Sequence, residues 1–467
     1  MKKSIALITG LLFLLGFAAA AFAIQADIPA APNPVVTASS THINLSGDLR
    51  VRGWYLGNIN SNSNYNPTKS ASSAYYDERV RLRLDVSSGP VSGRVSLETA
   101  PGTRSQSYKW GSEGINSRPS DVQFLEAWMN YAGSGLMGVP SGVKVGHMPL
   151  ALGPAGIFFD NTKFGDDAIV LYTSPTPNMH LTVLTFKPFE NNVYVNDDDL
   201  DGYVAVLNGE FAHQALGVSY TYLNQSEAST PLTITNGSGL AGNLSLQDLG
   251  IFGKGNISGV DYTAQADFQF GKDGGFNPVA GGSSVDAQGY GIWLGLGYRL
   301  NPVYIRGLFA YGSGNDGSTN KDKQFITFEN PHDMYYTLVY AYSMAGATGA
   351  DPHGNGINGG ISDTTVFNVG VDYSPVSKLK LSLDGYELWA SKANAAVLAS
   401  QFDVTTPTTT STYIGSEFDL RGSYHITKNL EYFAGLGVLS EGNFYKDLGS
   451  SFNTTPWVAM HGIQFNF

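Results

Sequence analysis

The last strand of the chain constrains its fold more than any other segment. In the final eleven residues, Trp457–Phe467, apolar side chains at positions 463, 465 and 467 alternate with glycine or polar side chains at 462, 464 and 466. The two sets therefore point to opposite faces of a strand. A chain end of this kind either closes a membrane-spanning barrel or completes a soluble β-sandwich, so the other segments must decide between them.

The N-terminus favours export from the cytoplasm. Met1-Lys2-Lys3 precedes an apolar run from Ile5 to Ala20, and Ala21-Phe22-Ala23 follows. A basic start, a short apolar core and an A-x-A site are the parts of a secretory signal peptide. We expect a signal peptide over residues 1–23, an uncleaved anchor being the alternative, then a flexible periplasmic segment over 24–41 and a barrel over 42–467.

The rest of the chain lacks a helical membrane span. No later apolar run approaches the roughly 20 residues that a membrane helix needs, and a bilayer-embedded chain without such runs must form a closed barrel. A mean hydropathy of -0.10 with 56 Gly, 26 Tyr and 25 Phe fits strands that alternate apolar and polar residues. A closing strand that ends in Phe is typical of bacterial outer-membrane β-barrels. We therefore predict an all-β, antiparallel transmembrane barrel in the outer membrane of a Gram-negative cell.

Alternation and turn residues predict about eighteen strands, with sixteen as the alternative. Short turns should be periplasmic and long loops extracellular. Because successive connections alternate between the two sides of the membrane, this rule requires a strand at 243–254. Without that strand, the tight turn at Asn301-Pro302 would fall outside the cell. The predicted strands are 43–56, 76–87, 90–99, 121–132, 142–150, 167–173, 179–187, 202–212, 215–224, 243–254, 258–270, 286–300, 302–312, 362–374, 378–390, 412–426, 429–440 and 456–467.

One extracellular connection, residues 313–361, is much longer than the others. A barrel of sixteen or eighteen strands encloses an aqueous lumen. A loop of this length either folds into that lumen and narrows it or packs on neighbouring loops at the surface. The sequence leaves both possibilities open.

The inward face of the early strands is predicted to carry charge. Alternation places a ladder of arginines in the lumen, namely Arg50, Arg52, Arg79, Arg81, Arg83 and Arg94. The acids expected on the same inner wall are Asp48, Asp77, Asp85, Glu98, Glu126, Glu417 and Asp419. Opposed charges of this kind select solutes by charge and orientation. The alternative is that the arginines and acids only neutralise one another and stiffen the wall.

An acidic loop suggests a calcium site. Asp197, Asp199 and Asp201, followed by Gly202, match the first half of a calcium-binding loop. The position of the closing glutamate is Asn208, so the motif is incomplete, and a solvated acidic loop is the alternative. The chain has no cysteine, which excludes disulfides and cysteine-ligated metals. No other cofactor is expected.

Three stretches resemble the alginate export family of outer-membrane barrels. Residues 413–420, YIGSEFDL, with the Gly-rich strand 429–437, resemble the family's G-x-E-x-D-L strand and the strand after it. Residues 143–153 are similar to a family strand in which His147 and Met148 stand where the family has Arg and Gln, and residues 311–315 resemble its S-G-D. The resemblance implies an eighteen-stranded barrel with a charged lumen that passes an anionic solute or polymer.

The favoured function is an outer-membrane channel, a porin, for small hydrophilic and possibly anionic solutes. The alternatives are export of an acidic polysaccharide such as alginate, and a barrel sleeve around a partner cytochrome. We do not expect the protein to be an enzyme, because the sequence contains neither an H-E-x-x-H motif nor a G-x-S-x-G elbow. The net charge of -12 argues against nucleic acid. The partners expected are outer-membrane lipid, the solute or polysaccharide and a possible periplasmic protein; the oligomeric state is left open.

Overall fold

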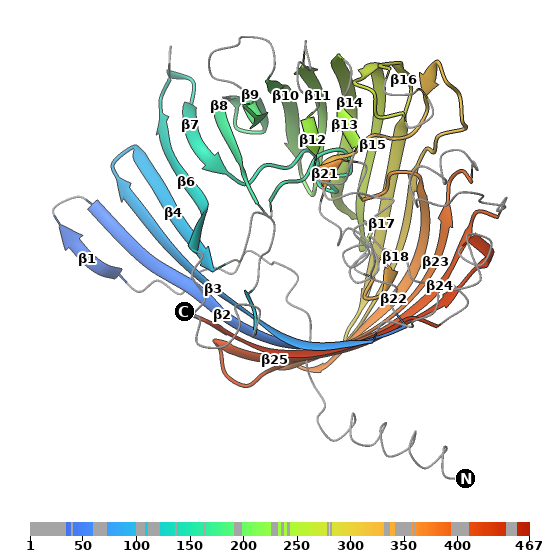
Figure 1. The fold of residues 1–467 in the computed structure, drawn as a ribbon. Helices are drawn as coiled ribbons and strands as arrows, with labels where there is room; N and C mark the ends of the chain where they lie inside the picture. The colour runs from blue at the N-terminus through green and yellow to red at the C-terminus, as the bar shows by residue number, and fades with distance from the viewer. Residues whose placement is uncertain are drawn as a thin grey trace.

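The chain forms a single closed antiparallel β-barrel. The computed structural model describes residues 34–38, 41–58, 72–99, 108–110, 122–135, 138–162, 164–190, 199–225, 232–234, 238–240, 243–277, 280, 283–330, 337–340, 356–357, 360–393, 411–444 and 455–467. Within these residues, eighteen strands follow one another around one curved wall, each antiparallel to both neighbours (Figure 1). No helix in this part of the chain has the length and apolar character needed to cross a membrane.

The barrel strands differ in length. They are β2 (Thr41–Gly57), β3 (Ser73–Ser88), β4 (Val91–Thr99), β6 (Val122–Gly133), β7 (Ser141–Met148), β8 (Asp166–Thr176), β9 (Met179–Phe189), β10 (Leu200–Phe211), β11 (Gln214–Gln225), β14 (Leu244–Ile257), β15 (Val260–Asp273), β17 (Tyr290–Leu300), β18 (Val303–Gly312), β22 (Thr364–Val376), β23 (Leu379–Ala390), β24 (Tyr413–His425), β25 (Leu430–Glu441) and β26 (Trp457–Asn466).

Eight short strands accompany them. They are β1 (Pro34–Ala38), β5 (Tyr108–Lys109), β12 (Leu232–Ile234), β13 (Ser238–Leu240), β16 (Asp286–Ala287), β19 (Lys321–Asp322), β20 (Phe328–Asn330) and β21 (Gly356–Ile357).

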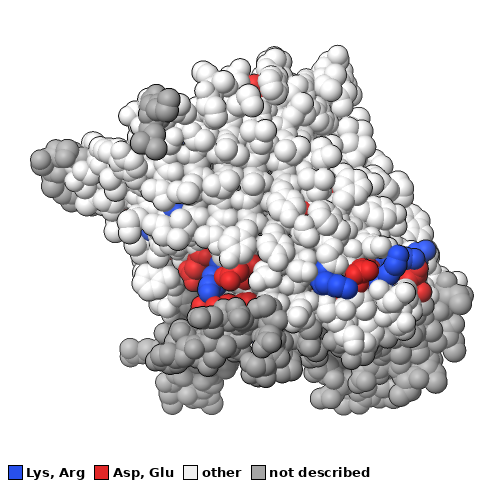
Figure 2. All heavy atoms as spheres, turned by 90° about the horizontal axis from the view of Figure 1, so that it is seen from above, with Lys and Arg blue, Asp and Glu red and all other residues white. Residues whose placement is uncertain are grey.

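Strand alternation separates an apolar outer wall from a polar interior. On β3, Leu82 and Leu84 are 41% and 38% exposed, whereas Arg79 and Arg81 on the opposite face are buried. This pattern is the reverse of a soluble protein's and fits lipid outside and a polar lumen inside. On the face shown in Figure 2, charged side chains gather in a narrow band, and the wall beside it is almost uncharged.

The strand prediction is confirmed, including the strand that parity required. β14 pairs with β11 on one side and β15 on the other, so the tight turns fall at one end, which we call the periplasmic end. The N-terminal segment differs from the prediction in one respect. Residues 34–38, expected to be part of a flexible lead-in, form β1 and pair with β2 between Thr41 and Asn44. The predicted signal peptide lies outside the described residues.

The barrel is closed by the pairing of its first and last strands. β2 and β26 pair from Asp48 with Asn466 to Gly57 with Trp457. Beyond that register, Gly47 and Phe467 exchange two backbone hydrogen bonds, of 2.8 and 3.0 Å. The seam leaves no open edge over this length, which lipid would not tolerate.

Gly47 makes room for the terminal side chain. The ring of Phe467 stacks on Phe465 with centroids 5.7 Å apart. A Cβ on residue 47 would lie 2.7 Å from Cζ of Phe467 and would also collide with the backbone oxygen of Arg81. The seam therefore needs both the terminal Phe and a residue without a side chain opposite it.

We predict that deleting Phe467, or replacing Gly47 by Ala, lowers the yield of folded barrel, because each change disturbs the seam. The measurement is the heat-modifiable fraction on gels after expression. Gly385→Ala is the matched control, because its Cβ would have its nearest neighbour, Cε1 of Phe418, at 3.5 Å. Normal yield of the Phe467 deletion would contradict the role given to the seam.

Candidate functional site

Two connections enter the barrel and form the walls of the candidate channel. The β7–β8 segment comprises residues 149–165 apart from 163, and the β18–β22 segment is described at residues 313–330, 337–340, 356–357 and 360–363. Both contain fully buried apolar side chains, among them Ile157, Phe158, Phe325 and Ile326. Their contacts are with inward-facing residues of the wall, so they lie inside the barrel.

A single strand, β15, fixes both segments. Gln269 accepts a hydrogen bond from the backbone N–H of Ile326 at 2.9 Å and donates one to the oxygen of the same residue at 2.6 Å. Gln265, four positions earlier and on the same inner face, bonds in the same way to Ala155 N–H at 3.1 Å and the Leu152 oxygen at 3.2 Å. Each glutamine amide thus supplies the donor and the acceptor that a neighbouring strand would normally provide. Without it, these buried backbone groups of the segments would have no hydrogen-bond partner.

The two segments also hold one another. The backbone N–H of Phe328 donates to the oxygen of Phe158 at 2.7 Å. The rings of Phe159 and Phe328 stack with centroids 6.0 Å apart, and both contact Phe186 of β9. This apolar contact, within the lumen, joins the segments to the wall on the side of β9.

Two carboxylates on β24 anchor a further part of the β18–β22 segment. Glu417 accepts hydrogen bonds from the backbone N–H groups of Val339 and Tyr340, at 2.7 and 2.8 Å. Asp419 accepts one from the N–H of Leu338 at 3.0 Å. Both carboxylates are 0% exposed. They face the interior, as the alternation predicts, but the segment covers them, so they hold the loop rather than contact the solute.

These contacts answer the question that the sequence left open for residues 313–361. Residues 325–328 and 338–340 lie inside the barrel, against β15, β9 and β24. Residues 321–322 instead pair with Asp286–Ala287 at the extracellular end of the wall.

Burial neutralises two acids in and beside this segment. Asp322 and Asp363 lie outside the membrane-spanning strands and are almost fully buried. Burial raises the pKa of Asp322 to about 7 and that of Asp363 to about 8. A large share of each group is therefore protonated at neutral pH, which lowers the cost of placing it away from water.

The arginine ladder lies on the inner wall of β2, β3 and β4, and its members form ion pairs. Arg79 pairs with Asp48 at 2.6 Å, Arg52 with Asp77 at 2.8 Å, and Arg81 with Glu98. Arg94 pairs with Asp85 at 2.6 Å and with Glu126 at 3.5 Å, and Arg83 reaches Glu126 at 3.8 Å. Arg50 is buried opposite Arg79 in the register of β2 and β3. The ladder thus faces the lumen, as the alternation predicts, and most of its arginines are paired with acids.

Only the periplasmic half of the ladder is open. The side chains of Arg79 and Arg81 are 9% and 7% exposed, whereas those of Arg83 and Arg94 are 29% and 27% exposed. Among the described residues, Nη2 of Arg81 and Nε of Arg83 are buried donors that have no hydrogen-bond partner. The part of the ladder that a solute can touch is therefore centred on Arg83, Arg94 and Asp85.

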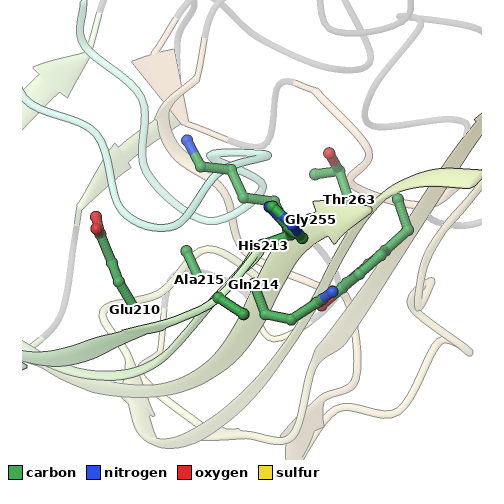
Figure 3. A pocket seen from close by; sticks show the side chains of 9 residues that line it. Glu210, His213, Gln214, Ala215, Gly255 and Thr263 are labelled. Atoms are coloured by element: carbon green, nitrogen blue, oxygen red, sulfur yellow. The ribbon is translucent and has the colours of Figure 1, made fainter. Parts of the chain in front are cut away.

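A cavity of about 430 Å³ lies on the other side of the barrel, at the periplasmic end of β10, β11, β14 and β15. Figure 3 shows Glu210, His213 and Thr263 around it. Lys254 also lines it. Glu210 and Lys254 give this cavity both signs of charge, so it does not extend the basic ladder.

A lysine occupies the acidic loop for which calcium was predicted. Lys187 Nζ lies 2.7 Å from Asp199, 2.8 Å from Glu190 and 3.5 Å from Asp201. Asp197 lies outside the described residues, and no group of three metal-ligating side chains occurs among the residues that the structure describes. The calcium site stays a prediction, in which the ion would have to compete with the ammonium group.

Sequence reasoning missed the residues that place the infolded segments. Gln265, Asp267 and Gln269 alternate along β15 and were visible as one polar face of a strand. Their partners could not be read, because Gln265 bonds to a residue 113 positions away. The only available signal was an unusually polar inner face in a strand without charge pairs.

An eighteen-stranded antiparallel barrel with an apolar outer wall, a charged interior and infolded segments is an outer-membrane channel. The comparisons with known proteins agree with this class. The alginate export family profile matches residues 54–459, and the chain belongs to that family. No curated protein matches the sequence.

Several solved structures are similar to this chain. OccK11 (OpdR) of Pseudomonas aeruginosa is 12% identical, with a TM-score of 0.50 over 91% of this chain and 96% of that one. OccK5 (OpdH) of the same organism is 12% identical over 91% and 98%, with a TM-score of 0.49. The outer-membrane channel DcaP of Acinetobacter baumannii is 11% identical over 93% and 99%, with a TM-score of 0.45. At 12% identity, the similarity to OccK11 concerns the fold alone.

We predict that Glu417→Gln raises single-channel conductance, because Gln offers one acceptor oxygen to two N–H groups. Leaving one of these buried N–H groups without its acceptor costs about 1–3 kcal/mol, so the β18–β22 segment should leave the wall more often. Glu431→Gln is the control, since it makes the same substitution near the periplasmic end of β25. Unchanged conductance and unchanged protease sensitivity at residues 337–340 in folded Glu417→Gln would refute this anchoring role.

We predict weak Ca²⁺ binding at Asp197, Asp199 and Asp201, strengthened by Lys187→Gln, which removes the competing cation. Titration calorimetry of the wild type, the Lys187 variant and the triple Asn variant measures this. Equal heats for the wild type and the triple variant would remove the site.

Proposed function

We propose that the channel conducts small hydrophilic solutes and prefers anions. The observation that carries the proposal is the accessible part of the ladder. Arg83 and Arg94 face the lumen with about a quarter of their side-chain surface exposed, and they share two carboxylates, Asp85 and Glu126. Guanidinium groups keep their charge at every physiological pH and offer several donors to a carboxylate or phosphate oxygen.

The infolded segments support selectivity rather than free diffusion. They fill part of the lumen with buried side chains, which leaves solutes a narrower path along the remaining wall. In a narrow path with low-dielectric walls, a fixed charge acts on a permeating ion more strongly than in bulk water. The charge of the ladder therefore acts on a permeating ion more strongly than it would in an open pore.

Export of an acidic polysaccharide is the second candidate, and the family match favours it. An anionic polymer would use the same exposed arginines. The difference lies in the width of the path, because a polymer must pass both infolded segments. Alginate oligomers added to one side of a planar bilayer separate the two: traversal, measured as recovery on the other side, supports export, and block without recovery supports a small-solute channel.

A sleeve around a cytochrome is less well supported. A threaded protein would have to displace both segments from Gln265, Gln269, Glu417 and Asp419. We also propose that the protein is a channel and not an enzyme, since the lumen residues described above make binding and anchoring contacts, and the sequence has none of the catalytic motifs considered. A periplasmic partner and the number of subunits are questions that binding and native-mass measurements would answer.

We predict that replacing Arg79, Arg81 and Arg83 together by Gln shifts the channel toward cation preference, because Asp48, Glu98 and Glu126 then lose partners. The reversal potential in a low-salt KCl gradient measures the shift. It should shrink at high salt, where the Debye length falls to about 3 Å at 1 M.

The controls separate selectivity from folding. Lys272→Gln removes a positive charge from the extracellular end of β15, where it pairs with Asp286 outside the lumen, and should leave the reversal potential unchanged. If burying Asp48 and Glu98 unpaired lowers the folded yield, Arg83→Gln alone gives a smaller shift in the same direction. An unchanged reversal potential in folded triple variant would count against the ladder.

A further inference from the structure

The lumen contains a cation that the arginine ladder does not include. Lys144 lies on β7 opposite Asn130 of β6 and Val170 of β8. Its strand neighbours in the register place it on the same face as Glu126 and Trp128, whereas Met129 and Tyr131, on the other face, are 63% and 48% exposed to the lipid side. Lys144 therefore faces the lumen, in the periplasmic half of the barrel.

An aromatic ring holds this lysine in place. Its Nζ lies 4.0 Å from the centroid of the Trp128 ring. The guanidinium of Arg94 lies 5.5 Å from the same centroid. The indole N–H of Trp128 donates to Glu126 at 2.8 Å, which fixes the ring. Cations stack on an indole because its face carries partial negative charge, and here one ring orients two of them.

Lys144 differs from its neighbours in that no carboxylate neutralises it directly. Among the described residues, Arg83 and Arg94 both have an acid within 4.0 Å, and Lys144 has none. The nearest acid in the group, Glu126, already bonds to Trp128 and pairs with Arg83 and Arg94. Three cations, Arg83, Arg94 and Lys144, thus share two acids, Asp85 and Glu126, and the excess positive charge lies with Lys144.

We propose that Lys144, oriented by Trp128, is the residue that gives the channel its anion preference and that it forms a transient binding site for small carboxylates. This inference rests on the proposed function and names the residue within it. A carboxylate entering the periplasmic half of the lumen meets an ammonium group with no acid among the described residues within 4.0 Å, whereas Arg94 is held by Asp85 at 2.6 Å and Arg83 shares Glu126 with it. The arginines then guide the anion, and Lys144 holds it.

Reversal potentials and block by succinate test this site. In a KCl gradient, Lys144→Gln should lower the chloride-to-potassium permeability ratio by about threefold, the effect of one charge at close range in a partly hydrated lumen. It should also weaken block by succinate. Lys144→Arg should restore both, because Arg also stacks on the indole and keeps the charge.

Lys254→Gln tests whether position matters. It removes the same charge from the opposite wall, where Lys254 shares a cavity with Glu210, and should change the ratio by less than half as much. An equal effect of the two variants, or no effect of Lys144→Gln in folded protein, would overturn the assignment. If the wild type itself shows no anion preference, the proposed function fails; if only the arginine variant shifts the ratio, the function stands and the Lys144 site fails.

Discussion

The structure depends on one constraint: every backbone hydrogen-bonding group that lipid surrounds must find its partner within the chain. The seam between β2 and β26 meets it for the wall, and the last residue, Phe467, takes part through its backbone and its ring. The same constraint operates inside. Where the β7–β8 and β18–β22 segments leave regular structure, their buried N–H and C=O groups take side chains of the wall as partners.

This division explains how much the sequence could predict. The number of strands follows from alternation and from the parity of short and long connections, which are local properties, and all eighteen were found. The inward direction of the arginines follows from the same alternation. The positions of the infolded segments could not be derived, because they depend on contacts such as Gln269 with Ile326, between residues 57 positions apart. Nothing in the local pattern distinguishes a glutamine that is hydrated from one that forms hydrogen bonds to the backbone of an infolded segment.

The sequence predicted which charged residues line the candidate site but not how far their charges neutralise one another. Six arginines on three strands suggest a strongly basic wall, yet the register places Asp48, Glu98 and Glu126 within reach of them. Buried pairs of this kind contribute little net charge to the lumen. The remaining net charge of the lumen depends on the few described charged groups without a direct partner, such as Lys144. The alternation of its strand shows only that Lys144 faces inward and does not show that it is unpaired. Counting the charges on a strand is therefore a poor guide to the field that a solute meets.

The position of Gln265 and Gln269 has a mechanical consequence. Both infolded segments are hydrogen-bonded to one strand, at positions four residues apart, and they contact each other again where Phe328 meets Phe158. They are therefore coupled to each other, while Glu417 and Asp419 also hold the second segment to β24. A displacement of either segment should move the other, so the two walls of the path should widen together.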